Sequence, residues 1–319
     1  MSVVSQITGF QRLCFITCIV IFGLIVLGGV VRATDSGLAC PDWPTCHGKL
    51  IPRWEKHTLI EYSHRLTASI AGVLVLGIAG WAWRSYRSVP AVLYPALLAL
   101  ALIILQASLG AVAVLNELPP EVVGLHLGLA LAILALLALV TATAMDIERP
   151  FQDNDESTVL GRLAALALLA TFALMLAGSY VAGAEYGLAC TGWPLCNSEV
   201  IPEGPAPVQV HFLHRLLAIC AGLALVPLLW FAWRARQQAP FVASLAAAAL
   251  GVYSLQALIG AANVWTELSD VVSAAHLAVG TLLWLLLAII GLRANGLYRL
   301  LPRSTRITSS RRLATGMGR

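Results

Sequence analysis

Eight long apolar segments, separated by polar connections, account for most of the chain. Each reaches the length of about 20 mostly apolar residues that a helix needs to cross the hydrocarbon core of a bilayer. The segments run approximately over residues 10–32, 59–83, 91–114, 121–145, 159–183, 209–233, 240–263 and 271–292. The pattern therefore predicts an all-α integral membrane protein with eight transmembrane helices.

The composition agrees with this prediction. Hydrophobic residues make up 59% of the 319 positions and charged residues only 11%, whereas soluble domains carry roughly 25% charged residues. No connection between two segments is long enough to form a soluble domain. We therefore expect membrane lipid around the chain, and any chemistry within the helices or just outside them.

The distribution of Lys and Arg predicts how the chain crosses the membrane. If the N-terminus lies inside, 14 arginines fall on the cytoplasmic side, and six lysines and arginines fall on the outer side. Because positively charged connections stay inside, both termini are expected in the cytoplasm and the two longest connections outside. The net charge of +4 comes mostly from an arginine-rich tail. An inside-positive tail is the simpler explanation of this charge, and no nucleic-acid partner is expected.

Two cysteine-containing segments reveal an internal repeat. The segment "GLACPDWPTC" at 37–46 returns as "GLACTGWPLC" at 187–196, an offset of 150 residues. Such self-similarity indicates a duplicated structural unit. The same offset aligns, without a gap, Pro52 with Pro202, His64 with His214, Arg65 with Arg215, Gln106 with Gln256, Gly110 with Gly260, and His126 with His276.

The repeat predicts the arrangement of the helices and the limits of each part. Four helices per unit is an even number, so both halves have the same orientation and form two tandem, parallel-repeat four-helix bundles. The expected parts are an N-terminal bundle at 1–145, a cytoplasmic linker at 146–158, a C-terminal bundle at 159–292 and a basic cytoplasmic tail at 293–319.

Four histidines lie within the predicted helices and are paired by the repeat. Burying a polar group without a partner costs several kcal/mol, so ionisable residues at membrane depth are functional candidates. Each of the four lies about five residues inside the outer end of an even-numbered helix, which places all of them at a similar, shallow depth. They are His64, His126, His214 and His276.

Two histidines at equal depth on parallel helices of one bundle are typical of a site that clamps a haem iron from both faces. The pattern thus predicts one haem, or a haem-like ligand, in each half. Two alternatives remain. Each histidine could hydrogen-bond across its bundle, or a zinc or copper ion could bind, although such ions usually need three or four ligands. Arg65 and Arg215 directly follow two of the histidines. Either they pair with haem propionates or they extend to lipid headgroups.

One departure from the repeat points to chemistry in the first half. Glu61 lies three residues before His64, on the same helix face, whereas the equivalent position in the second half is His211. A carboxylate beside a ligand in one half indicates that this half carries out proton chemistry, while the other half holds a resident cofactor. Alternatively, Glu61 caps the N-terminus of its helix, where a carboxylate is also favourable.

The four cysteines of the outer connections are expected to form two disulfides. Cys40 with Cys46, and Cys190 with Cys196, lie on the oxidising side of the membrane, where disulfides persist. A Trp-Pro sequence between the cysteines of each pair favours a tight, stiff turn. A structural role explains both pairs. For the first pair, redox exchange with a thiol carrier is the alternative.

Taken together, these features resemble the haem A synthases, of the bacterial CtaA type related to mitochondrial Cox15. The resemblance covers the whole chain, and the local motifs that carry it are "EYSHR" at 61–65 and "HFLHR" at 211–215. It implies an oxidoreductase of the bacterial cytoplasmic (inner) membrane. Such an enzyme oxidises the C8 methyl of haem O to a formyl group, through hydroxylation, and so provides haem A for terminal oxidases.

The resemblance also implies roles for single residues and partners. His64 and His126 would be the ligands around the substrate haem O, His214 and His276 would bind the iron of a resident haem b, and Glu61 would be an essential acid. The implied partners are haem O, delivered by a haem O synthase, and an electron donor of unknown identity. A thiol carrier and a homo-oligomer are compatible with the sequence.

Two rival functions remain open. One is a dihaem b-type membrane cytochrome that only transfers electrons, in which Glu61 is structural. The other is a membrane thiol oxidoreductase, which the spacing of the cysteines disfavours because such enzymes typically use a C-x-x-C pair and the chain has none.

Overall fold

The computed structural model describes residues 8–146 and 155–294. Within these ranges the chain forms eight α-helices and no β-strand, and each helix is long and apolar enough to span a membrane. The helices are α1 Gly9–Ala33, α2 Lys56–Ser85, α3 Pro90–Leu115, α4 Pro120–Asp146, α5 Asp155–Gly183, α6 Ala206–Arg234, α7 Pro240–Trp265 and α8 Asp270–Arg293. The predicted all-α membrane fold is confirmed.

The helix limits follow the sequence signals closely. Every helix begins and ends within four residues of the predicted segment. Thr8 and Gln11 form a capping box at the start of α1, in which each side chain satisfies a backbone amide that the first turn leaves unpaired. Pro90 and Pro240 open α3 and α7, where the missing proline N–H costs nothing.

The predicted linker and tail lie largely outside the described residues. Of the linker at 146–158, residues 147–154 are not described, and α5 already begins at Asp155. Of the tail at 293–319, residues 295–319 are not described.

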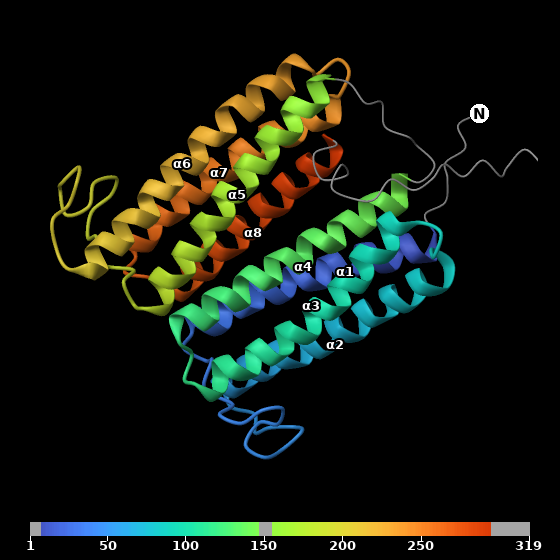
Figure 1. Ribbon diagram of the computed structural model, residues 1–319. Coiled ribbons are helices and arrows are strands. Elements are labelled where there is room, and N and C mark those ends of the chain that lie inside the picture. Colours follow the sequence, from blue (N-terminus) through green and yellow to red (C-terminus); the bar gives the residue numbers. More distant parts are fainter. Residues whose placement is uncertain (1–7, 147–154, 295–319) are drawn as a thin grey trace, which may run out of the picture.

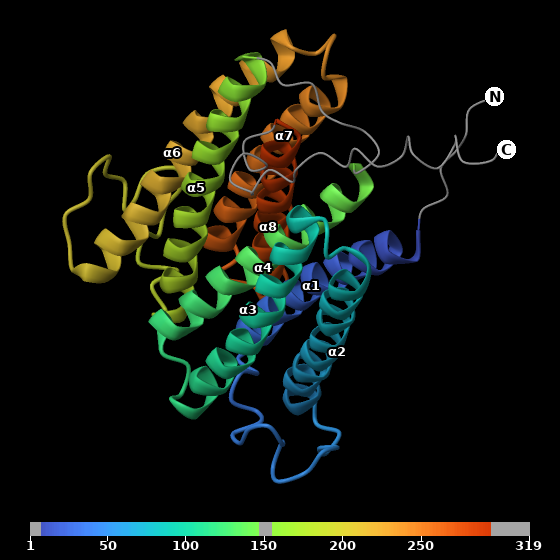
Figure 2. The same ribbon diagram turned by 45° about the vertical axis from the view of Figure 1, so that its right-hand side comes forward.

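The eight helices pack as two bundles placed side by side (Figures 1 and 2). Helices α1 to α4 contact one another in one bundle and α5 to α8 in the other. Between the bundles, α1 packs on α8, α4 packs on α5, and α4 also contacts α8. These four central helices are accordingly the most buried of the eight, whereas α3 is the least buried.

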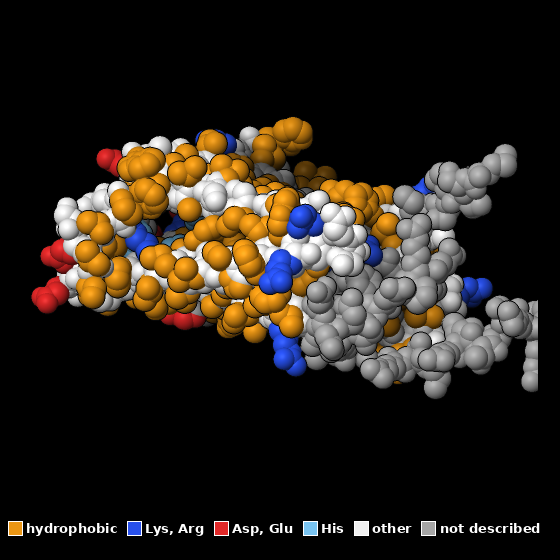
Figure 3. Space-filling model, turned by 90° about the horizontal axis from the view of Figure 1, so that it is seen from above, with side chains coloured by type: hydrophobic (Ala, Val, Ile, Leu, Met, Phe, Trp, Pro, Cys, Tyr) orange, Lys and Arg blue, Asp and Glu red, His pale blue; other side chains and the backbone are white. Residues whose placement is uncertain are grey.

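The cysteine loops lie at one end of the bundles (Figure 1). The beginnings of α1 and α5 and the ends of α4 and α8 lie at the opposite end. Between the ends, hydrophobic side chains are spread over the described part of the face that Figure 3 shows. Such a surface suits a lipid environment, in which apolar residues can face both outward and inward.

Contacts between the bundles involve side chains that reach into the other half. Trp284 of α8 donates from Nε1 to the carbonyl of Leu131 on α4, at 2.9 Å. Its ring also packs against Phe172 of α5, with 5.5 Å between the ring centroids. Near the outer ends, Arg32 of α1 donates from Nη2 to the carbonyl of Ala182 on α5, at 2.7 Å. The two halves are therefore joined by specific polar contacts as well as by apolar packing.

Trp284→Phe tests the polar contact between the halves. Phenylalanine keeps an aromatic ring beside Phe172 but cannot donate to Leu131. We expect the free energy of unfolding in detergent to fall by about 1 kcal/mol, the net contribution of one hydrogen bond. The measurement is the midpoint of thermal or denaturant unfolding. As a control, Trp230→Phe changes a tryptophan that is 61% exposed and should leave the midpoint nearly unchanged. Equal shifts for both variants would contradict the prediction.

Candidate functional site

The two intramembrane histidines of the first half each pack against a glycine of the preceding helix. His64 of α2 faces Gly28 of α1, where an added Cβ would lie 3.2 Å from the imidazole Cε1. His126 of α4 faces Gly110 of α3, where the corresponding distance would be 3.1 Å. Side chains larger than hydrogen at these positions would push on the rings, so the glycines allow both imidazoles to lie close to the neighbouring helices.

The second half repeats this arrangement. His214 of α6 faces Gly178 of α5, with 2.8 Å between an added Cβ and Cε1, and His276 of α8 faces Gly260 of α7, with 3.1 Å. Both glycines are the repeat counterparts of those in the first half, 150 residues later. Both halves therefore contain the same contact between a glycine and an intramembrane histidine.

The structure brings each predicted histidine pair together. His64 and His126 are close enough to interact electrostatically, and the same holds for His214 and His276. Each residue is half-buried. Within the described part of the chain, Nδ1 of each ring is buried without a hydrogen-bond partner. Either ring nitrogen of an imidazole can ligate a metal centre, and the hydrogen bond made by the other nitrogen decides which one does so.

This donor set fits a haem iron. Two imidazoles from separate helices of one four-helix bundle could bind a haem iron together, and haem is a common ligand of such bundles. The rings also have backbone neighbours: the carbonyl of Leu24 interacts with His64 and that of Leu174 with His214, although neither Nδ1 reaches full hydrogen-bond geometry. Carbonyls in this place typically orient a ligating imidazole.

A bare metal ion fits less well. Among the described residues, no group of three or more His, Cys, Asp and Glu side chains is arranged to hold one. The zinc or copper alternative therefore gains no support from the arrangement of side chains.

Glu61 lies inside the protein and not at the helix terminus. Its residue is only 4% exposed, and α2 begins at Lys56, one and a half turns earlier. Its Oε1 accepts from Nε of Arg65 at 2.8 Å, which forms a buried ion pair. The alternative that Glu61 caps α2 is thus wrong, because the carboxylate binds a side chain and not the amides of the first turn.

Arg65 also binds the first cysteine loop. Its Nη1 donates to the carbonyls of Asp42, at 2.6 Å, and Thr45, at 2.8 Å, and Nη2 donates to that of Cys40, at 2.5 Å. The guanidinium group therefore joins the loop to Glu61 on α2. The sequence analysis did not predict this role. The signal that could have indicated it is the arginine that follows the first cysteine of each loop by 25 residues in both halves.

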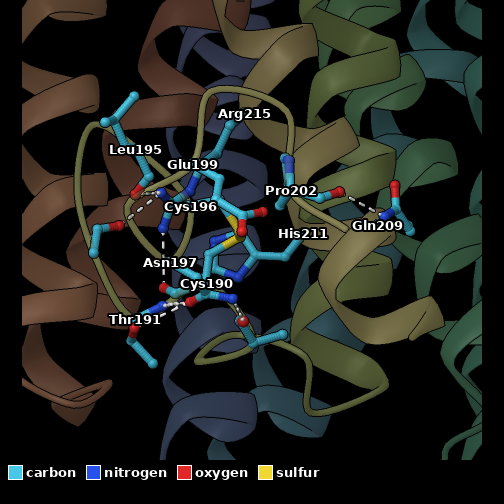
Figure 4. Close-up of a disulfide and its surroundings, with 12 residues drawn as sticks. Cys190, Thr191, Leu195, Cys196, Asn197, Glu199, Pro202, Gln209, His211 and Arg215 are labelled. Atoms are coloured by element: carbon cyan, nitrogen blue, oxygen red, sulfur yellow. Dashed lines mark hydrogen bonds between the residues drawn. A yellow bond between two sulfur atoms is a disulfide. The ribbon is translucent and has the colours of Figure 1, made fainter. Parts of the chain in front are cut away.

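Arg215 binds the second cysteine loop in the same way (Figure 4). It donates to the carbonyls of Gly192, at 2.7 Å, Leu195, at 3.0 Å, and Cys190, at 3.1 Å, with a longer contact to Pro194. Both arginines thus hold the outer loops. Their predicted pairing with haem propionates stays a prediction.

His211, the counterpart of Glu61, makes a different contact. It is buried, and its Nδ1 lies 3.0 Å from the carbonyl of Tyr186 in the same half. The ion pair of the first half thus has no equivalent in the second, since Arg215 has no carboxylate partner among the described residues. The two halves therefore differ at this position in buried charge: the first has the ion pair of Glu61 with Arg65, and the second has a histidine that binds a backbone carbonyl.

Both predicted disulfides are present, between Cys40 and Cys46 and between Cys190 and Cys196. All four cysteines are at most 2% exposed. A thiol that attacked either bridge would need the loop to open first, because disulfide exchange requires access to a sulfur atom.

A single acidic residue organises the first loop. The Asp42 carboxylate accepts from the Thr45 hydroxyl, from the amide of Gly48 at 2.9 Å and from the amide of His47 at 2.5 Å. These hydrogen bonds, that of Thr45 above all, lower the pKa of Asp42 to about 2. The counterpart of Asp42 in the second loop is Gly192, which has no carboxylate. There, the side chain of Asn197 accepts from the amide and the hydroxyl of Thr191. Both loops therefore have internal polar support.

Comparison with known proteins agrees with this geometry. A family model described as "Cytochrome oxidase assembly protein" (COX15-CtaA) matches residues 11–288, which is most of the chain. The chain belongs to the COX15-CtaA family. The matched region includes all four histidines, Glu61 and both cysteine loops.

Several curated relatives carry the name heme A synthase. A COX15-CtaA relative from Symbiobacterium thermophilum is 34% identical over 66% of this chain and 71% of its own length. One from Halalkalibacterium halodurans is 35% identical over 65% of this chain and 71% of its own. One from Lysinibacillus sphaericus is 30% identical over 83% of this chain and 88% of its own.

Gly178→Ala tests the glycine support. The new methyl group would lie 2.8 Å from Cε1 of His214, so we expect the ring to be displaced and the haem retained per purified polypeptide to decrease. Gly251→Ala is the control in the same half, because no atom lies within 4 Å of the added methyl group. Alanine favours helix formation at both sites, so a general effect on folding would appear in both variants. The measurement is haem content by absorbance against protein concentration. Unchanged haem content in Gly178→Ala would contradict the predicted role of this contact.

Proposed function

We propose that this protein is a haem A synthase, an oxidoreductase that converts haem O to haem A by oxidising the C8 methyl group to a formyl group through hydroxylation. Membership of the COX15-CtaA family and the names of its relatives support the reaction. The observation that carries the proposal is the buried Glu61, three residues before His64 on α2, whose counterpart in the second half is the buried His211.

The two halves have different tasks in this proposal. The N-terminal bundle, with His64 and His126, binds haem O as substrate, because its buried Glu61 lies three residues before His64 on α2, whereas the counterpart of Glu61 in the second half is His211. The C-terminal bundle, with His214 and His276, holds a resident haem b. When bound, that haem supplies an electron-transfer centre. In a monooxygenase-like hydroxylation, O2 is the oxidant: one oxygen atom enters the substrate, and electrons from an external donor, together with protons, reduce the other oxygen atom to water.

The side chains of the first half have separate roles in the proposed reaction. The imidazoles of His64 and His126 fix the substrate on both faces, which sets the distance between its reacting methyl group and the protein. Glu61 accepts or returns protons at its carboxylate as the carbon is hydroxylated and water is lost. Arg65 keeps this carboxylate in one position through the buried ion pair. The helices and the closed loop limit the access of bulk water.

The proposal includes a place in the cell. We place the protein in the bacterial cytoplasmic membrane with both termini inside and the disulfide loops outside, because the charge distribution follows the positive-inside rule and disulfides persist on the oxidising side. Haem O would reach the first bundle from a haem O synthase. The exposed Lys49 and Arg53 of the first loop, with Lys56 at the start of α2, suit a substrate with carboxylate groups.

Electron transfer alone explains the site less completely. A dihaem b-type cytochrome would use both histidine pairs in the same way. It would give no reason for a buried carboxylate in one half and a histidine in the other.

Co-expression with a source of haem O tests the reaction. The extracted haems are separated by chromatography and weighed by mass spectrometry. We expect hydroxylated and formylated products of haem O. Unaltered haem O in a folded, haem-loaded protein would overturn the proposal.

Glu61→Gln tests the proposed acid. Glutamine keeps the size and loses the charge, so turnover should fall by about 10²-fold or more, the usual contribution of a positioned acid or base, at unchanged haem content. Glu121→Gln is the matched control, because Glu121 is an exposed carboxylate of the same half at the start of α4. Full turnover in Glu61→Gln would remove Glu61 from the mechanism and favour the electron-transfer function.

A further inference from the structure

Arg65 binds two parts of the first half at once. One N–H group of its guanidinium binds the Glu61 carboxylate, and others bind three backbone carbonyls of the cysteine loop. The two side chains are nearly buried, with 13% of Arg65 and 5% of Glu61 exposed. A guanidinium group is planar and rigid, so its contacts cannot move independently of one another.

The carbonyls that Arg65 binds all belong to the ring that the disulfide closes. They come from Cys40, Asp42 and Thr45, and the bridge joins Cys40 to Cys46. Three carbonyls converge on one cation only while this short segment stays folded. A loop without its cross-link has more conformational freedom, and ordering it around Arg65 costs correspondingly more entropy.

The second half provides an internal control for this arrangement. Arg215 binds the carbonyls of Cys190, Gly192 and Leu195, which are the repeat counterparts, 150 residues later, of the three residues bound by Arg65. The arginine clamp on the loop is thus common to both halves. Among the described residues, only Arg65 also binds a buried acid, because the counterpart of Glu61 is His211, which binds the carbonyl of Tyr186.

We propose that Arg65 is a positioning residue that makes closure of the Cys40–Cys46 loop and the placement of the Glu61 carboxylate depend on each other. When the loop opens, Arg65 loses three acceptors and no longer holds Glu61 in one place. Coupling between two sites is reciprocal, so removing the charge of Glu61 also weakens the hold of Arg65 on the loop. The role in catalysis rests on the proposed function of Glu61, whereas the coupling itself does not.

The first experiment measures loop opening without any haem chemistry. The free cysteines Cys14, Cys18 and Cys220 are first blocked under non-reducing conditions. The full-length protein is then treated with dithiothreitol, and newly formed thiols are alkylated and counted by mass spectrometry at each pair. The two disulfides of one molecule are thus compared under identical conditions.

We expect Glu61→Gln to accelerate reduction of Cys40–Cys46 by about 10-fold, because the glutamine oxygen can still accept from Arg65 but the hydrogen bond to a neutral group is weaker than one to a charged group. The rate at Cys190–Cys196 should stay unchanged. Arg65→Lys should accelerate the first pair alone and Arg215→Lys the second pair alone. If Glu61→Gln leaves the rate at the first pair unchanged, or accelerates both pairs equally, the coupling is overturned.

The second experiment measures the reverse direction through turnover of haem O. Changing Cys40 and Cys46 to Ser should lower turnover per haem-loaded molecule, and adding Glu61→Gln should cause less further loss than it does in the wild-type protein. Such non-additivity indicates that the two sites act together, which a merely stabilising disulfide would not produce. Changing Cys190 and Cys196 to Ser should lower stability and leave turnover unchanged. Full additivity of the first set of changes would overturn the coupling.

The two experiments separate the coupling from the function. If the wild-type protein forms no haem A while Glu61→Gln still accelerates reduction of the first pair, the coupling holds and the proposed reaction is wrong. If the wild-type protein forms haem A and Glu61→Gln changes neither rate of reduction, the reaction stands and the coupling is overturned.

Discussion

Within the hydrocarbon layer, every polar group must find a partner in the protein or in a ligand that the protein holds. This constraint explains where the polar side chains of these helices lie. Hydroxyl groups return to the carbonyl four residues earlier, as in Thr17, Thr67 and Thr281, and Trp284 and Gln106 donate to carbonyls of neighbouring helices. The four intramembrane histidines are among the exceptions, because the buried Nδ1 of each imidazole has no hydrogen-bond partner among the described residues. Together with their pairing by the repeat, this indicates ligand sites.

The duplicated unit keeps its scaffold constant and changes its chemistry at single positions. Glycine supports, histidine pairs, disulfides and arginine clamps occur in both halves at the same offset. Against this background, the replacement of Glu61 by His211 alters the buried charge, while the arginine of each half keeps its contacts with the three equivalent loop carbonyls. A comparison within one chain thus separates what the fold requires from what one half adds, because both halves experience the same membrane and solvent.

The sequence predicted the fold well, for physical reasons. The thickness of a bilayer sets the length of each helix, and the offset of 150 residues paired the histidines before any contact was known. The arginine clamps were missed because their acceptors are backbone carbonyls, which leave no trace in residue type. The glycine supports were missed as specific contacts, since small residues in membrane helices usually serve general packing. The contact between Trp284 and Leu131 could not be predicted either, because a tryptophan in an apolar segment does not indicate which carbonyl its N–H group will bind.

The contact between Arg32 and Ala182 bears on the history of the fold. The two residues occupy equivalent positions in the two units, 150 residues apart, and they touch each other. In an assembly of two identical units, this position would meet its own copy, and two arginines would bring like charges together. Arg32 is compatible with the present interface because its Nη2 binds a backbone carbonyl beside an uncharged side chain and its Nη1 pairs with Asp35 of its own half. The interface thus depends on the divergence of the two units at this position.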